Sequence, residues 1–407
     1  MIKIKILQSL KLVFLLSLSL ILSLSINAFS SAAITASTAI DTVTVYGLLK
    51  KEMRYIKQSS EANYRTTYGP KDVDGVESRF GIKGSLPLST ITTKYKLEVG
   101  FNSARDNKGA TDTANSTNGP GDERIRVRSA VINLNNQSLG TLSFGQDNTP
   151  GIARNTNFDP LYGTSVEIIA QDLIYFAGAI LGASMNHPIL PRSTFYNQLA
   201  YETPSIFGFQ LAIAHDRNSQ SIVQRNSGAN VQQWWTSALY FDKIYSNIKI
   251  AATAVYADQD KEGIVPEDHQ YFWQIFVKTF FQNDNKIDKF SIGMGFYQTK
   301  VNRNNKNKSF SAVASYDIFS DLILSGSYYK TILSDDASAS SILGTTGEQS
   351  QYASGLIYKF NNNVKAHLVF AFFTRSWDVT PTNVFEKSRS KSDNSGYNTA
   401  LGMTITF

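Results

Sequence analysis

The 407-residue sequence contains no cysteine, which excludes disulfide bonds and a thiol nucleophile. Its four histidines, His187, His215, His269 and His367, lie too far apart in sequence to match the spacing of a metal site. Beyond the N-terminal region, no apolar run is long enough for a membrane-spanning helix. A protein with these absences must hold its shape by other means, and a closed hydrogen-bonded sheet is one of them.

The sequence also lacks a strong excess of either charge. There are 39 Lys and Arg against 33 Asp and Glu, a formal net charge of +6. Three lysines precede residue 33 and no acidic residue does, so the remainder carries about +3. This balance argues against nucleic acid as a partner. No serine–histidine pair or other nucleophile with its base is recognisable, so neither catalysis nor a cofactor is expected.

The N-terminus has the three parts of a secretory signal peptide. Lys3, Lys5 and Lys11 form a positive region, an apolar run covers 12–26, and small residues follow at 28–33. A membrane anchor is the alternative, but this run is shorter than the roughly 20 residues that a spanning helix needs. We therefore expect cleavage within 28–33, removal of the segment up to residue 33 at most, and a single domain over 34–407.

Past this region, apolar residues recur at every second position. At the C-terminal end, Leu401, Met403, Ile405 and Phe407 alternate with Gly or Thr, which gives a strand one apolar side and one polar side. Such an edge would aggregate in a soluble protein, whereas a closed barrel in lipid requires it. Segments of about ten residues with this pattern are typical of transmembrane β-strands, although a soluble β-sandwich has the same period. We expect the terminal strand to face lipid and to close the sheet against 43–55.

Short and long connections alternate along the chain. The short ones are expected at 86–89, 135–137, 241–243, 283–285, 318–320 and 361–363, and the long polar ones at 103–123, 258–268, 333–349 and 377–393. This alternation is typical of a barrel with brief turns at one rim and long loops at the other. The count of strands is about sixteen, enough to enclose an aqueous lumen. The predicted fold is an all-β, 16-stranded antiparallel transmembrane β-barrel.

One connection, 148–191, breaks the alternation. It contains Asp159, Glu167 and Asp172 together with an apolar piece at 168–181. Loops of this length usually serve a function. A surface loop would not need so much apolar material, whereas a loop folded inward onto the barrel wall would. We expect this connection to narrow the lumen.

Arg124, Arg126 and Arg128 lie two residues apart and share one face of a strand. Facing lipid, each would cost roughly 2–4 kcal/mol at the membrane midplane, so the lumen or the rim is expected. We interpret them as a basic ladder that opposes loop carboxylates and sets a transverse field across the water, biasing ion selectivity. The alternative is simple pairing with Asp122 or Glu123 at the base of the loop.

Aromatic residues gather near the ends of the expected strands. Membrane barrels carry aromatic girdles at both lipid interfaces, which is the preferred interpretation, and a sugar-stacking track in the lumen is the alternative. The residues are Tyr55, Phe101, Tyr201, Tyr256, Tyr328, Tyr358, Phe360 and Phe407.

Several segments, in this order, resemble those of general trimeric porins from Gram-negative outer membranes. They are VTVYG (43–47), SRFGIKG (78–84), RSAVINL (128–134), GTLSFG (140–145) and NQLAYETP (197–204), the last followed by Gly208 and Phe209. The resemblance implies a sixteen-stranded barrel in outer-membrane lipid, a homotrimer, and a third loop folded into the lumen as an eyelet. It also implies that the terminal Phe407 is the signal read by the barrel-assembly machinery.

In that family, arginines on the wall face carboxylates on the loop. By matching motif, the resemblance assigns Arg79 and Arg128 to the basic wall, with Arg192 as a third candidate. The spacing adds Arg126, and Lys50 completes the expected wall. The carboxylates expected on the acidic loop are Asp159, Glu167 and Asp172. Lys50 is a substitute, because Leu48 occupies the place where many relatives have lysine. The loop also lacks the glycine-rich acidic motif of the enterobacterial members. Other charged residues with lumen phase are expected only to wet the wall, and these are Lys83, Lys94, Lys96 and Glu98.

The expected function is a passive, water-filled channel for ions and small hydrophilic solutes. A substrate-selective channel on the same barrel is the first alternative. A barrel adhesin or enzyme that acts through its loops is the second.

Overall fold

A computed structural model describes most of the chain from Thr42 onward. The described residues are 42–60, 64–71, 78–101, 125–150, 158–161, 164, 195–218, 232–261, 271–282, 288–300, 305–335, 343–381 and 391–407. The chain divides into two units, Met1–Asp41 and Thr42–Phe407, and the first lies outside the described residues. Removal of a signal peptide therefore stays a prediction.

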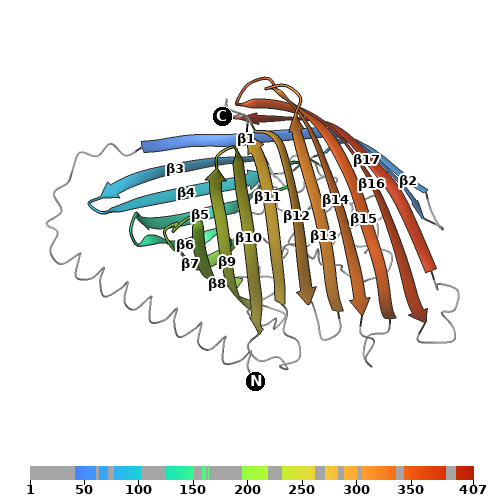
Figure 1. Cartoon of the computed structure of the whole chain (residues 1–407), viewed down its shortest axis with the longest axis horizontal. Coiled ribbons are helices and arrows are strands. Elements are labelled where there is room, and N and C mark those ends of the chain that lie inside the picture. The colour runs from blue at the N-terminus through green and yellow to red at the C-terminus, as the bar shows by residue number, and fades with distance from the viewer. Residues whose placement is uncertain are drawn as a thin grey trace. The chain divides into compact units, whose positions relative to one another are not determined.

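The second unit is a single antiparallel sheet of seventeen strands (Figure 1). The strands are β1 (Thr42–Ser60), β2 (Tyr64–Lys71), β3 (Ser78–Leu88), β4 (Ile91–Phe101), β5 (Ile125–Asn136), β6 (Gly140–Asn148), β7 (Phe195–Glu202), β8 (Phe209–Asn218), β9 (Gln232–Tyr245), β10 (Ile248–Lys261), β11 (Tyr271–Gln282), β12 (Asp288–Lys300), β13 (Asn305–Asp317), β14 (Leu322–Asp335), β15 (Leu343–Lys359), β16 (Val364–Pro381) and β17 (Lys391–Thr406). No helix of the described residues is long and apolar enough to cross a membrane, a finding that concerns helical spans alone.

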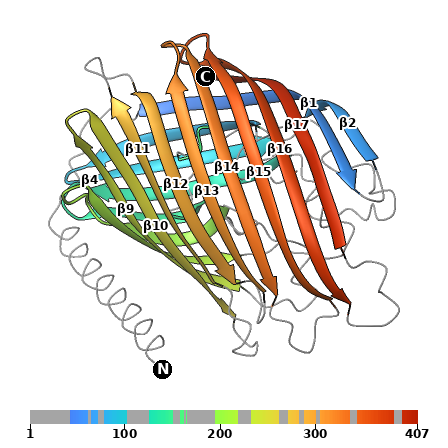
Figure 2. The same cartoon turned by 45° about the vertical axis from the view of Figure 1, so that its right-hand side comes forward.

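The first and last strands close the sheet on itself. β1 pairs with β17 from Leu48↔Thr406 to Ser60↔Asn394, and the two strands lie side by side in Figure 2. Beyond the last strand residue, Gly47 and Phe407 exchange backbone hydrogen bonds of 3.0 and 3.1 Å. Closure leaves no free edge in the ring, as a barrel in lipid requires. The prediction that the terminal strand closes against 43–55 is confirmed.

The count of sixteen is also confirmed once β2 is placed. β3 pairs with residues 42–48 of β1, and β2 pairs with residues 52–59 on the same edge. β2 is therefore an addition beside β1. The other sixteen of the seventeen strands each pair with two ring neighbours.

Connections alternate in length, but the strands extend further than expected. Short turns lie at 89–90, 137–139, 246–247, 318–321 and 360–363, whereas 102–124 and 149–194 are long. The turn expected at 241–243 is wrong, because these residues belong to β9. The loops expected at 333–349 and 377–393 shrink to 336–342 and 382–390, since backbone pairing continues to Leu343↔Pro381.

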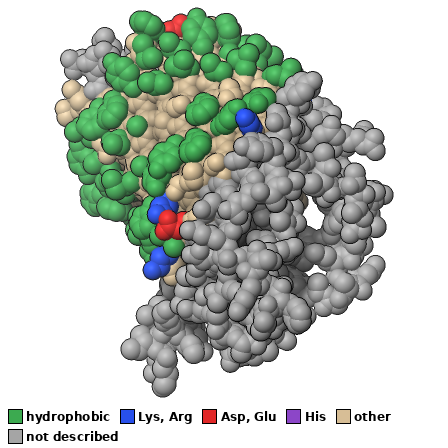
Figure 3. Space-filling view, turned by 90° about the vertical axis from the view of Figure 1, so that its right-hand side faces the viewer, with side chains coloured by type: hydrophobic (Ala, Val, Ile, Leu, Met, Phe, Trp, Pro, Cys, Tyr) green, Lys and Arg blue, Asp and Glu red, His purple; other side chains and the backbone are tan. Residues whose placement is uncertain are grey.

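The outer face of the ring is apolar. Leu401, Met403 and Ile405, expected to face lipid, are all exposed, and so are the aromatic side chains of Tyr256 and Tyr358. Figure 3 shows one such face, where hydrophobic side chains gather over the described strands with few charged ones among them. Soluble monomers rarely expose an apolar surface of this extent, whereas a membrane barrel needs it as a band around its waist. Polar side chains consequently gather on the inner face.

Candidate functional site

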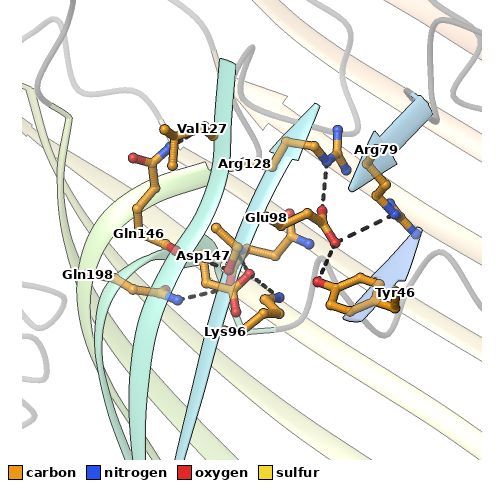
Figure 4. Close-up of polar contacts among 11 residues, drawn as sticks. Tyr46, Arg79, Lys96, Glu98, Val127, Arg128, Gln146, Asp147 and Gln198 are labelled. Atoms are coloured by element: carbon orange, nitrogen blue, oxygen red, sulfur yellow. Dashed lines mark hydrogen bonds and ion pairs between the residues drawn. The ribbon is translucent and has the colours of Figure 1, made fainter. Parts of the chain in front are cut away.

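Charged side chains from three neighbouring strands meet on the inner face of the ring. They are Arg79 in β3, Glu98 in β4 and Arg128 in β5 (Figure 4). Each follows or precedes an exposed apolar residue of the outer face, so strand alternation turns these three inward. The outward neighbours are Phe80, Leu97 and Val127.

The carboxylate of Glu98 is the centre of this cluster. Its Oε1 accepts a hydrogen bond of 2.8 Å from Nε of Arg128, and its Oε2 lies 3.5 Å from Nε of Arg79. The hydroxyl of Tyr46 in β1 donates to the same Oε2 at 2.8 Å. Glu98 and Arg128 are only 7% and 6% exposed. Charge-assisted hydrogen bonds of this kind fix side chains firmly, so these groups form a preorganised unit.

A glycine allows Tyr46 to reach Glu98 across an intervening strand. Tyr46 lies opposite Gly81 in the β1–β3 pairing, and Gly81 lies opposite Glu98 in the β3–β4 pairing. A Cβ atom at Gly81 would overlap the Tyr46 ring. Because glycine leaves that space open, the Tyr46 ring crosses β3 beside Gly81 and its hydroxyl reaches Glu98 of β4.

A β-bulge positions Arg128. The β4–β5 register places Glu98 opposite Ser129 and Val99 opposite Val127, so Arg128 has no cross-strand partner. Both Arg128 and Ser129 are buried on the inner face, while Ala130 turns outward. Bulges commonly re-aim a side chain in this way. Here the bulge brings a guanidinium onto Glu98 and reverses the phase of the rest of β5.

The cluster keeps one net positive charge, because two guanidinium groups share a single carboxylate. Two residues before Glu98 in β4, Lys96 forms a 2.9 Å ion pair with Asp147 of β6. The two charges of this pair cancel, so it adds no net charge to the cluster. Glu98 was expected only to wet the wall, and its partnership with two arginines is the site feature that sequence reasoning missed. The sequence does contain one sign of this partnership, which is the glycine at Gly81 among the inward-facing positions of β3. Its meaning becomes clear only when the strand register places it between Tyr46 and Glu98.

Of the other residues predicted to line the constriction, some lie within the described part of the chain and some outside it. Lys50 is buried on the inner face, where its backbone N–H donates to Oγ of Ser78 at 3.0 Å. Arg126 belongs to β5, but its side chain is not described. Arg192, Glu167 and Asp172 lie outside the described residues, and their roles stay predictions.

A described fragment of the 148–191 connection contacts the far wall. Phe158 is buried in a hydrophobic cluster on the barrel wall, where its ring centroid lies 4.7 Å from that of Phe276. Its carbonyl accepts a hydrogen bond of 3.3 Å from Nζ of Lys278. The other cluster members are Tyr297, Val313 and Tyr329, so the wall involved is β11–β14. In ring order β12 stands opposite β4, which places Phe158 across the lumen from Glu98.

Three residues later, Leu161 packs against a different part of the wall, formed by β15–β17. It is fully buried among Ala353, Val369, Ala371 and Ala400 of β15–β17. Between the two anchors, Oδ1 of Asp159 accepts a hydrogen bond of 2.9 Å from the backbone N–H of Leu161, and the Asp159 side chain is largely buried. These contacts put this fragment against the inner face. Inward folding of the whole loop stays a prediction.

A second charged group lies on the inner face of β1. Glu52 contacts Nε2 of His367 at 2.7 Å through Oε1, and its Oε2 lies 3.6 Å from Arg54. All three side chains are buried. Among the described residues, no three His, Cys, Asp or Glu side chains come together as a metal site would require.

Comparison with known proteins gives concordant results. A family profile described as Gram-negative porin matches residues 21–376. An outer membrane porin protein of Bordetella pertussis is 27% identical over 204 residues, covering 46% of this chain. The matched part is 47% of that protein, so the chain spans about half the length of the curated relative.

Solved structures share the fold. An anion-selective porin from Comamonas acidovorans has a TM-score of 0.61 at 15% identity, covering 90% of this chain and 100% of its own. OmpT of Vibrio cholerae, an outer membrane protein, has a TM-score of 0.55 at 12% identity, covering 91% and 99%. Salmonella typhi OmpF, solved with daunomycin, has a TM-score of 0.53 at 16% identity, covering 90% and 97%.

Proposed function

The chain belongs to the Gram-negative porin family, and we propose that it forms a water-filled channel in the outer membrane for passive passage of ions and small hydrophilic solutes. One observation carries the proposal. A ring of sixteen strands has an apolar outer face and places Arg79, Glu98 and Arg128 together on its inner face. A ring of this size leaves room for an aqueous channel, whereas an eight-stranded ring fills with side chains.

The Glu98 cluster is the proposed basic side of the constriction. Arg79 and Arg128 retain one net positive charge after Glu98 is counted, and Arg79, whose side chain is 27% exposed, would present that charge to water between low-dielectric walls. Such a field orients water and polar solutes, disfavours apolar ones and biases the channel toward anions. Arg126, Arg192 and Lys50 are proposed to extend the same side.

The opposing side is proposed to be the 148–191 connection. Phe158 anchors it on the wall across from the cluster, and Leu161 anchors it on the neighbouring wall formed by β15–β17. Asp159 lies between these anchors, and it would contribute negative charge together with Glu167 and Asp172. A loop held at two apolar points would keep a fixed aperture rather than sweep the lumen.

The assembly and partners are also proposals. A homotrimer in outer-membrane lipid is proposed, and a structure with the same fold is described as the trimer form of Vibrio cholerae OmpT, with a TM-score of 0.50. Phe407, which is exposed at the rim, is proposed as the signal for the barrel-assembly machinery. No catalysis and no cofactor are assigned.

Reconstitution tests this function. Purified protein in planar bilayers should give stepwise conductance in KCl that grows linearly with salt, and proteoliposomes should swell in small sugars at rates that fall with solute size. A folded barrel without conductance would contradict the proposal. Saturable flux of one sugar alone would favour the substrate-selective alternative.

A further inference from the structure

Three lysines share the inner face on the short-turn side of the Glu98 cluster. Lys83 of β3 stands directly opposite Lys96 of β4, and Lys94 stands opposite Ser85, one inward position nearer the 89–90 turn. Directly opposed side chains have Cβ atoms about 5 Å apart and diagonal ones about 7–8 Å apart, so all three charges are close.

Among the described residues, Lys96 is the only one of these three lysines with a carboxylate partner. Lys96 pairs with Asp147, whereas the structure gives neither Lys83 nor Lys94 an ion pair with a described residue. The ammonium of Lys83 lies 5.2 Å from the centroid of the Tyr46 ring, a contact that holds the charge in place without cancelling it. Both Lys83 and Lys94 are exposed to the interior. The charges of Lys83 and Lys94 repel each other, and an anion bound between them would relieve that repulsion.

Within the part of the chain that the structure describes, the surroundings supply hydrogen-bonding groups but no further carboxylate. Thr44 lies opposite Lys83, and Ser85 and Asn133 lie opposite Lys94, all with inward phase. The nearest described acidic groups on this wall, Glu98 and Asp147, already have basic partners.

We propose that Lys83 and Lys94 form an anion-binding step for small dianions, such as dicarboxylates, just below the constriction. The proposal rests on the channel function proposed above and names its preferred solutes. A dianion would place one negative group at each ammonium, with Thr44 and Asn133 completing its hydrogen bonds. Binding should be weak, on the order of millimolar, because a channel site must also release its ion.

The test measures chloride current through wild-type channels in KCl while potassium succinate is added at constant ionic strength. Succinate should reduce the current with a half-effect in the millimolar range, and acetate at equal charge should not. In a K83Q/K94Q variant the half-effect should move at least about fivefold higher, as expected for the loss of two exposed ion pairs. A K83R/K94R variant should retain inhibition.

Lys249 provides a matched control. It faces inward near the same rim but on another wall, and Asp242 neutralises it at 3.2 Å. K249Q should leave succinate inhibition unchanged. An equal loss in K249Q, equal inhibition by acetate, or full inhibition of K83Q/K94Q would each overturn the dianion site. Wild-type channels that conduct KCl but ignore succinate would overturn the site alone. Absence of any KCl conductance would overturn the channel function and, with it, the site.

Discussion

His367 of β16 reaches across β17 and places Nε2 2.7 Å from Oε1 of Glu52 in β1, although 315 residues separate the two. The intervening residue is Gly402, which lies opposite His367 on one side and opposite Glu52 on the other. This repeats the arrangement of Tyr46, Gly81 and Glu98. In both cases a glycine in the middle strand lets a ring bridge three strands. The His367–Glu52 contact thus fastens the seam where the barrel closes.

Gly402→Ala should weaken that seam. The added Cβ would overlap His367 and the Glu52 side chain, and overpacking of this kind typically costs about 1–3 kcal/mol. Urea unfolding in detergent, followed by tryptophan fluorescence, measures the loss. Gly326→Ala is the control, because its Cβ would meet only a carbonyl oxygen at 3.6 Å. Equal stability of the two variants would show that the contact does not hold the seam.

Glu98→Gln should make the channel more anion-selective. The substitution removes the carboxylate shared by Arg79 and Arg128, so the cluster gains one net positive charge. One unit charge about 4 Å from a passing ion is worth about 1 kcal/mol in water. It favours chloride and disfavours potassium by that amount, so the chloride-to-potassium permeability ratio should rise by up to about 30-fold. Reversal potentials in a KCl gradient give this ratio. Glu348→Gln, which breaks the Lys330 pair on the outer face, should not change it, and a ratio unaffected by Glu98→Gln would remove Glu98 from the site.

Phe158→Ala should loosen the loop without unfolding the barrel. The change removes the ring that contacts Phe276, and phenylalanine-to-alanine changes in buried sites typically cost about 3–5 kcal/mol. Single-channel recordings should show higher open-channel noise and a changed mean conductance. Phe319→Ala, in an exposed turn, is the control. Unchanged noise in Phe158→Ala would contradict a role for this anchor in fixing the aperture.

Phe407→Ala should lower assembly in cells more than folding in the test tube. The backbone bonds between Gly47 and Phe407 do not need the ring, so refolding in detergent should proceed to a similar yield. Loss of the terminal aromatic side chain should reduce the amount of folded protein in the outer membrane. Phe360→Ala, another exposed aromatic residue near a rim, should assemble normally. An equal yield of Phe407→Ala in cells would reject the assembly role.

Much of the fold follows from local pattern. Alternation of apolar and polar residues predicts strands and their outer face, and turn lengths predict an antiparallel ring. Closure by Leu401–Phe407 follows from the need to leave no edge in lipid. Alternation and turn lengths depend on residues close in sequence, which is why a single sequence specifies them.

The site is harder to predict, because it depends on register between distant strands. Phase alone turns Arg79 and Arg128 inward, but Glu98 becomes their partner only through the β3–β4 register and the bulge at Arg128. Nothing near His367 in sequence indicates Glu52. Each such pairing is a tertiary fact that strand alternation leaves open.

The reversal potential of Arg128→Ala channels in a KCl gradient tests most directly whether the Glu98 cluster lines the constriction. Removal of the guanidinium leaves Glu98 balanced by Arg79 alone, so the cluster loses its net positive charge. We expect a shift toward potassium relative to wild type, opposite in sign to that of Glu98→Gln. Reversal potential and conductance both equal to those of wild type would contradict the assignment of this cluster to the constriction.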